Sequence, residues 1–179
     1  MSDDTIQKIY ALDTDWLVVA MTQYPPDVMP EFWDHLLSLI KQDRIIICDP
    51  VYQEIMYQDD DLSKWLKTNV NGALVEPTDE DLIFVKEKIM SEYEQKFSNW
   101  FNLDDPNGLS ADPFLVATAA VRKAVVVTNE SKKIMQANTP ISKVPNACDS
   151  FGVECICSDP KNHRQSSVVD FLRDSGFRK

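Results

Sequence analysis

The chain has 179 residues, of which 44% are apolar, and a formal net charge of −11. This length and composition allow one sizeable core, so we expect a single domain over residues 1–179, with its core at about 8–158 and a helical C-terminal tail at 159–179. The negative charge argues against a protein that grips nucleic acid over a broad basic surface. It remains compatible with a site of several carboxylates that divalent cations neutralise.

The cysteine content and hydropathy favour a cytoplasmic protein. The four cysteines lack paired C-x-x-C spacing, which opposes both a disulfide framework and a zinc ribbon, so we expect reduced thiols. No stretch approaches the roughly eighteen uninterrupted apolar residues of a membrane span. The first residues also lack the basic and apolar regions of a secretory signal, so we expect no membrane association.

Apolar patterns predict alternating strands and helices along the chain. Up to residue 108 the predicted order is a strand at Ile9–Leu12, a helix over Phe32–Ile40, a strand at Ile45–Cys48, a helix opened by Asp49-Pro50 that carries Glu54, a short helix between Asp59–Asp61 and Asn71-Gly72, a long helix from Thr78 through Phe97, and a loop at 104–108. Thr78 and Asp81 are spaced as in a capping box, with Asp in place of Glu or Gln, so we expect the long helix to begin there.

The stretch from Leu109 to Glu130 predicts a buried helix followed by a buried strand. Asp112 is placed to cap the helix with its carboxylate, and Pro113 suits the first helical position, where its missing N–H costs nothing. Residues 114–121 are apolar on nearly every side, which is typical of a helix enclosed by other elements. Val125-Val126-Val127 then predicts a parallel strand that stops at Thr128-Asn129-Glu130.

The remaining residues complete the alternation of strands and helices. The order is a short helix at Lys132–Gln136, a helix from Val144 that Gly152 ends, a last strand at Val153–Cys157, and a terminal helix at Val168–Asp174. This alternation predicts a parallel sheet covered on both faces, which is a three-layer α/β domain.

Four acids occupy comparable places in this arrangement. Asp13 follows the first strand, Glu54 lies in the helix after the second, Asp112 opens the buried helix, and Glu130 ends the next strand. Because these positions face one edge of a parallel sheet, we expect the carboxylates to gather there. Oxygen ligands of this kind suit Mg²⁺ or Mn²⁺, and such a site hydrolyses phosphodiesters. Thr128 is placed to orient an acid or water, and basic groups that could hold the phosphates are Arg122, Lys123, Lys132, Lys133 and Lys143.

Several segments resemble, in order and spacing, the motifs of PIN-like domains, the fold of many VapC-type toxin ribonucleases. They are Tyr10–Leu17, Val51–Ile55, Ala111–Ala117 and Val126–Glu130, and Val144–Cys148 with Gly152-Val153 is similar to a mostly prokaryotic branch of these proteins. The resemblance implies an α/β/α fold with a mostly parallel sheet, acting on RNA with Mg²⁺ or Mn²⁺. The implied catalytic and metal-site residues are Asp13, Glu54, Asp112 and Glu130, supported by Asp15 and Thr128. It also implies that an antitoxin partner is encoded next to this protein. Whether the protein forms a homodimer is left open at this point.

Two departures from the family pattern bear on activity. The family usually has Asn where this chain has Asp15, and Asp where it has Glu130, with a further acid often at the position of Lys132. Glu reaches one methylene further than Asp, so the geometry of the fourth acid is altered.

Two other functions fit the same residues. Asp13 and Asp15 resemble the D-x-D signature of haloacid-dehalogenase phosphatases, in which the first Asp is phosphorylated and the second acts as acid and base. Only 51 residues follow Thr128 to supply the rest of that signature, which weakens this hypothesis. The other alternative is a non-catalytic PIN-like module that binds a partner with a basic surface, such as a cationic antitoxin segment.

Overall fold

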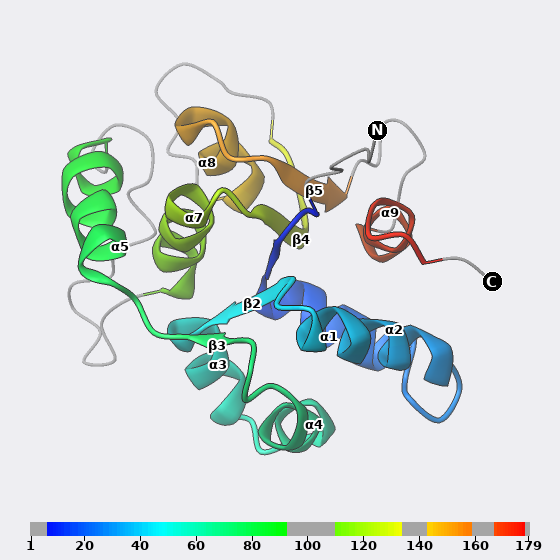
Figure 1. Ribbon diagram of the computed structural model, residues 1–179. Coiled ribbons are helices and arrows are strands. Elements are labelled where there is room, and N and C mark those ends of the chain that lie inside the picture. The colour runs from blue at the N-terminus through cyan, green and yellow to red at the C-terminus, as the bar shows by residue number, and fades with distance from the viewer. Residues whose placement is uncertain (1–6, 93–109, 134–142, 159–166, 178–179) are drawn as a thin grey trace, which may run out of the picture.

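The computed structural model describes residues 7–92, 110–133, 143–158 and 167–177 (Figure 1). Within these residues, five strands form one parallel sheet in the order β3-β2-β1-β4-β5. The strands are β1 (Tyr10–Leu12), β2 (Ile45–Cys48), β3 (Leu74–Val75), β4 (Val125–Ser131) and β5 (Cys155–Ser158). The sheet register pairs Tyr10 with Ile45 on one side and with Val125 on the other.

Helices connect the strands. They are α1 (Thr14–Gln23), α2 (Pro30–Lys41), α3 (Asp49–Met56), α4 (Asp61–Asn69), α5 (Asp79–Phe84), the π-helical turn η1 (Val85–Ile89), the 3₁₀ turn η2 (Met90–Glu92), α7 (Ala111–Arg122), α8 (Val144–Phe151) and α9 (Ser167–Asp174). None of the helices in the described part of the chain has the length and apolar character needed to cross a bilayer.

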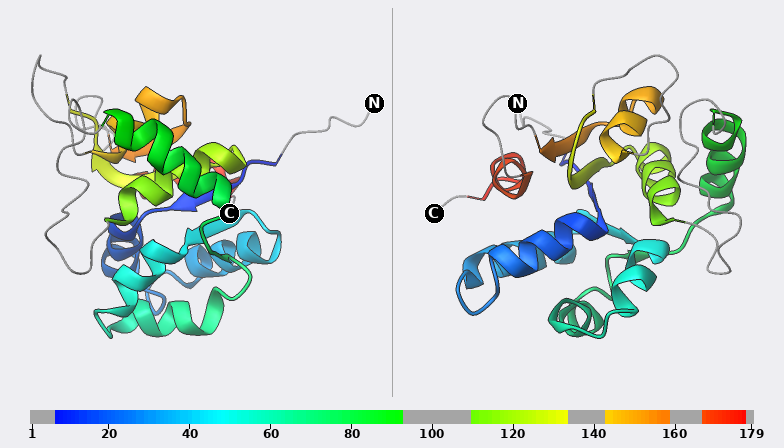
Figure 2. Two further views of the ribbon diagram at one scale, coloured as in Figure 1. Left: turned by 90° about the vertical axis from the view of Figure 1, so that its left-hand side faces the viewer. Right: turned by 180° about the vertical axis from the view of Figure 1, so that it is seen from behind.

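The helices cover both faces of the sheet, as the two opposite views in Figures 1 and 2 show. On one face α7 packs on β1, β2 and β4, with α8 and α5 beside it. On the other face α1 and α9 pack on β4, and α2 packs on β2. The predicted three-layer α/β/α architecture is therefore confirmed.

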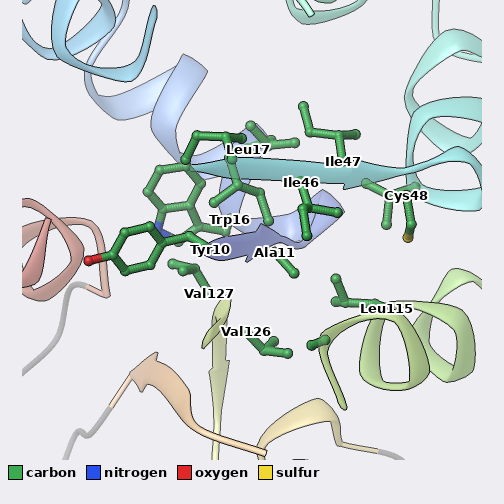
Figure 3. Packing of buried hydrophobic residues seen from close by; sticks show 14 of the residues in the cluster. Tyr10, Ala11, Trp16, Leu17, Ile46, Ile47, Cys48, Leu115, Val126 and Val127 are labelled. Atoms are coloured by element: carbon green, nitrogen blue, oxygen red, sulfur yellow. The ribbon is translucent and has the colours of Figure 1, made fainter. Parts of the chain in front are cut away.

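The central strands β1 and β2 are apolar throughout, as expected of strands that are buried on both faces. Residues of β1 and β2 are at most 6% exposed, and Figure 3 shows Trp16 of α1 and Leu115 of α7 packed around these strands. The terminal helix α9 adds Phe171, whose ring meets those of Tyr10 and Trp16 edge-on at centroid distances of 5.1 and 4.9 Å. The buried apolar side chains of the sheet, of α7 and of α9 form one cluster.

Most predicted elements appear within two residues of their expected bounds, but three details differ. The N-cap of α7 is Ser110, whose Oγ accepts the Asp112 amide at 3.3 Å; the helix begins at Ala111, so the predicted capping by Asp112 is wrong. The strand β4 continues past the predicted stop to Ser131. The two-residue strand β3 is too short to produce an apolar pattern and was not predicted.

The helix from Thr78 begins with the predicted capping box. Its helical path changes to a π-helical turn at Val85, and its predicted continuation through Phe97 lies outside the described residues. The loop predicted at 104–108 also lies outside them, as does most of the helix predicted at 132–136; Lys132 and Lys133 are not helical.

Candidate active site at the carboxyl edge of the sheet

The order in which the chain adds strands to the sheet reverses between β1 and β4. From β1 it proceeds through β2 to β3 at one side, and then returns to add β4 and β5 at the other. In open α/β sheets, the crevice at such a switch point, outside the carboxyl ends of the strands, is the usual place for a site. Asp13 follows β1, and its amide donates to the carbonyl of Val127 in β4 at 3.0 Å, so the two strand ends are held together.

Asp13 is the most enclosed acid of this edge. It occupies the N-cap position of α1 but makes no side-chain capping hydrogen bond, and it is only 4% exposed. Burial, followed by the charges of Asp15 and Asp112, raises the pKa of Asp13 well above its ordinary value, while a hydrogen bond with Thr128 opposes the rise. The Asp13 carboxyl therefore caps no backbone amide of α1, and it lies within electrostatic reach of Asp15 and Asp112.

Asp15 is held in place by the end of β4. Its Oδ1 accepts hydrogen bonds from the Thr128 hydroxyl at 3.2 Å and from the Asn129 amide at 3.0 Å. Thr128 is fully buried, and its hydroxyl also accepts the Glu130 amide at 3.1 Å. The Thr128 hydroxyl therefore connects Asp15 of α1 to the backbone at the end of β4.

Glu54 links three elements at this edge. Its Oε2 accepts the Thr14 hydroxyl of α1 at 2.7 Å, and its Oε1 accepts the Ala111 amide at 3.1 Å. A carboxylate at the first amide of α7 is stabilised by the positive end of the helix dipole. Glu54 therefore fixes where α7 begins and so where Asp112 lies.

Asp112 lies in the first turn of α7, partly exposed at the surface of the site. Burial raises its pKa to about 7, and the charges of Glu130, Glu54 and Asp15 add to the rise. Because these acids come from α3, β4 and α1, the raised pKa shows that the fold brings them into electrostatic reach of one another.

Glu130 is engaged by the segment that starts α8. Its Oε1 forms an ion pair with the Lys143 ammonium, and its Oε2 accepts the Val144 amide at 2.8 Å. Both carboxylate oxygens are therefore occupied by groups of the protein itself. Residues of the site that the sequence did not single out are Thr14, Asn129 and Ser110; Lys143 was only one of five basic candidates.

A cavity of about 1150 Å³ opens beside this edge. Its walls include Thr14 and Glu54 of the site, together with Phe114 of α7 and the 88% exposed Tyr57 at the end of α3. Lysine and arginine are absent from its lining within the described part of the chain. The site therefore has open space next to it on the side of α3 and α4.

The acids fit a divalent cation by their chemistry and charge. The charge of Asp112 raises the pKa of Asp13, and the charge of Asp15 raises the pKa of both, so a bound cation would relieve this repulsion. Among the described residues, however, no three His, Cys, Asp or Glu side chains are arranged as a group able to hold a metal ion. Mg²⁺ commonly binds through one or two carboxylates and keeps several waters, and Asp13 and Asp112 suit that open mode.

Comparison with known families identifies the chain. The model of a family described as a domain of unknown function (DUF4411) matches residues 10–160. The chain belongs to the DUF4411 family. No curated protein matches this DUF4411 chain in sequence.

The fold of the DUF4411 chain is similar to that of a solved structure. It is a chain of the crystal structure described as VapBC2 from Rickettsia felis bound to a DNA fragment from their promoter. The match has a TM-score of 0.50 and 18% sequence identity, and it covers 84% of this chain and 99% of that chain. The DUF4411 chain therefore has the PIN-like fold that its motifs resemble, with the acids described above at its switch point.

Proposed function

We propose that this protein is a metal-dependent endoribonuclease that hydrolyses RNA phosphodiester bonds and serves as the toxin component of a toxin–antitoxin pair. The observation that carries the proposal is the coupling of Asp112 to Glu54, Glu130 and Asp15 at the switch point of a PIN-like sheet. Carboxylates that repel one another in a partly buried crevice are a feature of sites that bind cations.

The roles of the residues follow from their contacts. Asp13 and Asp112 are the carboxylates we expect to hold Mg²⁺ or Mn²⁺, since neither forms an ion pair with a lysine or arginine of the described residues. A bound ion of this kind supplies charge for a phosphate oxygen and lowers the pKa of an attacking water. Thr128 orients Asp15, and Glu54 holds the start of α7 so that Asp112 faces the site.

The proposed partner is an antitoxin protein. VapBC2 is described as bound to a DNA fragment from the promoter, and a chain of that assembly shares the present fold. With a net charge of −11, this protein suits a partner that presents a basic surface. We place the protein in the cytoplasm, where RNA and an antitoxin are both accessible.

A non-catalytic binding module is the second candidate. It is favoured by Glu54 and Glu130, whose oxygens are all occupied by hydrogen bonds or an ion pair within the chain. The phosphatase alternative has less support because Asp13, its nucleophile, is 4% exposed and has a raised pKa. A carboxyl this deeply buried is poorly placed to attack a phosphoryl group of a substrate.

The test is cleavage of a mixed single-stranded RNA in Mn²⁺, Mg²⁺ or EDTA by the wild type, Asp112→Asn and Asp61→Asn. Asp61 is a matched control because it also lies in the first turn of a helix, but its side chain is 91% exposed. We expect cleavage to require metal, to fall by about a hundredfold or more in Asp112→Asn, and to persist in Asp61→Asn. Metal-independent cleavage, or equal activity in a folded Asp112→Asn variant, would contradict the proposal.

A further inference from the structure

Lys143 brings an ammonium group to the acidic edge of the sheet. Lys143 lies at the N-cap position of α8, and its Nζ pairs with Oε1 of Glu130. The Glu130 interaction is the main reason that the pKa of Lys143 is raised, and Asp15 and Asp112 raise it further. The ammonium is therefore within the electrostatic reach of the acids on α1 and α7.

Three of the other four basic candidates are paired elsewhere or lie away from this edge. Arg122 donates to both oxygens of the fully buried Asp81 at 2.9 Å. Arg122 and Lys123 also lie at the far end of α7 from Asp112, about 15 Å along the helix axis. Lys132 pairs with Asp149 on α8, where both side chains are about half exposed.

Glu130 fixes both the backbone and the side chain of the segment at Lys143. One oxygen accepts the Val144 amide at 2.8 Å, and the other receives the Lys143 ammonium. The side chain of Lys143 remains 31% exposed. An ammonium has three donors, so the pairing with Oε1 of Glu130 does not exhaust its capacity to bind an anionic oxygen.

We propose that Lys143 is the residue of this edge that binds a phosphate oxygen of the nucleic acid, and that Glu130 is the positioning residue that holds Lys143. That the bound molecule is a nucleic acid rests on the proposed function, whereas the contact between Lys143 and a phosphate oxygen does not. Glu130 then acts through Lys143 and is not a metal ligand, which differs from the role implied by the PIN-like resemblance. The longer reach of Glu relative to Asp suits this role, since its carboxylate spans the Lys143 side chain and the Val144 amide.

The first test measures binding of a single-stranded RNA oligonucleotide in EDTA, by fluorescence anisotropy at several salt concentrations. Each phosphate contact of a single strand adds about 0.7 to the slope of log affinity against log salt. We expect Lys143→Gln to lower this slope by about 0.7 and Lys143→Arg to restore it. Lys132→Gln, which removes a lysine from the neighbouring surface, should leave the slope unchanged.

The second test asks whether Glu130 binds metal. A ligand that binds only the folded state raises the melting temperature, so Mn²⁺ should shift the melting temperature of the wild type. We expect Glu130→Gln to keep that shift and Asp112→Asn to lose most of it. If Glu130→Gln loses the Mn²⁺ shift while its metal-free melting is unchanged, Glu130 is a metal ligand and this part of the proposal is wrong.

The outcomes separate this proposal from the ribonuclease function. A wild type that cleaves RNA, with the same salt slope in Lys143→Gln, would overturn the role of Lys143 and leave the nuclease standing. A wild type that is inert toward RNA, but binds it with a slope that depends on Lys143, would support the phosphate contact and overturn the nuclease. Absence of any binding by the wild type would overturn both. Lys143→Met, which keeps the apolar stem, repeats the comparison if Lys143→Gln melts early.

Discussion

Replacing Asp112 by Asn should stabilise the metal-free protein, and more so at alkaline pH. The pKa of Asp112 is raised from 3.8 to about 7 in the folded state, chiefly by burial and by Glu130. A carboxyl with a raised pKa binds its proton more tightly in the folded state. Its favourable contribution is therefore complete below about pH 4 and is lost as the pH rises through about 7.

The size of the effect follows from this shift in pKa. A rise of about three pKa units means that ionising Asp112 costs the folded state about 4 kcal/mol above pH 7. Because Asp112 is partly exposed, water screens part of this cost, and we expect about 2 kcal/mol. For a domain of this size, that is a rise of about 4–8 °C in melting temperature at pH 8. At pH 5 the wild-type carboxyl is mostly protonated, so the gain should be less than half as large.

The assay is thermal melting followed by circular dichroism in EDTA at pH 5 and pH 8. Asp61→Asn serves as the control and should shift the melting temperature little at either pH, because the Asp61 side chain is 91% exposed. A melting temperature of Asp112→Asn that falls at pH 8, or rises equally at both pH values, would refute the reasoning that acids repel one another at this edge.

Three further predictions concern the scaffold that positions the site. Asp81→Asn leaves Arg122 without its fully buried partner and should cost about 3–5 kcal/mol in urea unfolding; a loss below about 1 kcal/mol would show that the ion pair contributes little. Ser110→Ala removes the cap of α7 and should cost about 1 kcal/mol, whereas Ser110→Gly should cost only a few tenths; equal losses would contradict a capping role. Phe171→Ala should cost about 3–5 kcal/mol because its ring packs on Trp16 in the core, and an unchanged stability would mean that α9 is only loosely attached.

The fold could be predicted from sequence because its signals are local. A buried parallel strand has an uninterrupted apolar run, so Ile45–Cys48 was predicted with the bounds that the structure shows. The left-handed Gly152 ends α8 as expected, since glycine adopts that conformation without steric cost. The position of Asp13 after β1 likewise followed from the end of an apolar strand.

The partners of the acids could not be predicted because they depend on contacts between distant segments. Glu54 meets the Ala111 amide across 57 positions of sequence, and no local pattern specifies such a contact. The Ser110 cap was missed because Asp112 and Pro113 form an equally good local start signal two residues later. Nothing in the sequence distinguishes Lys143 from other surface lysines, because its ion pair with Glu130 depends on the fold.

The most direct test of the central claim is to determine the end groups of RNA cleaved by the wild type in Mn²⁺. Attack by a metal-activated water leaves a linear phosphate on one fragment and a hydroxyl on the other, with one phosphate oxygen drawn from solvent. We predict linear phosphate ends that carry ¹⁸O from labelled water, with no product in EDTA. A 2′,3′-cyclic phosphate would show attack by the ribose hydroxyl instead and would contradict metal-dependent hydrolysis at this carboxylate edge.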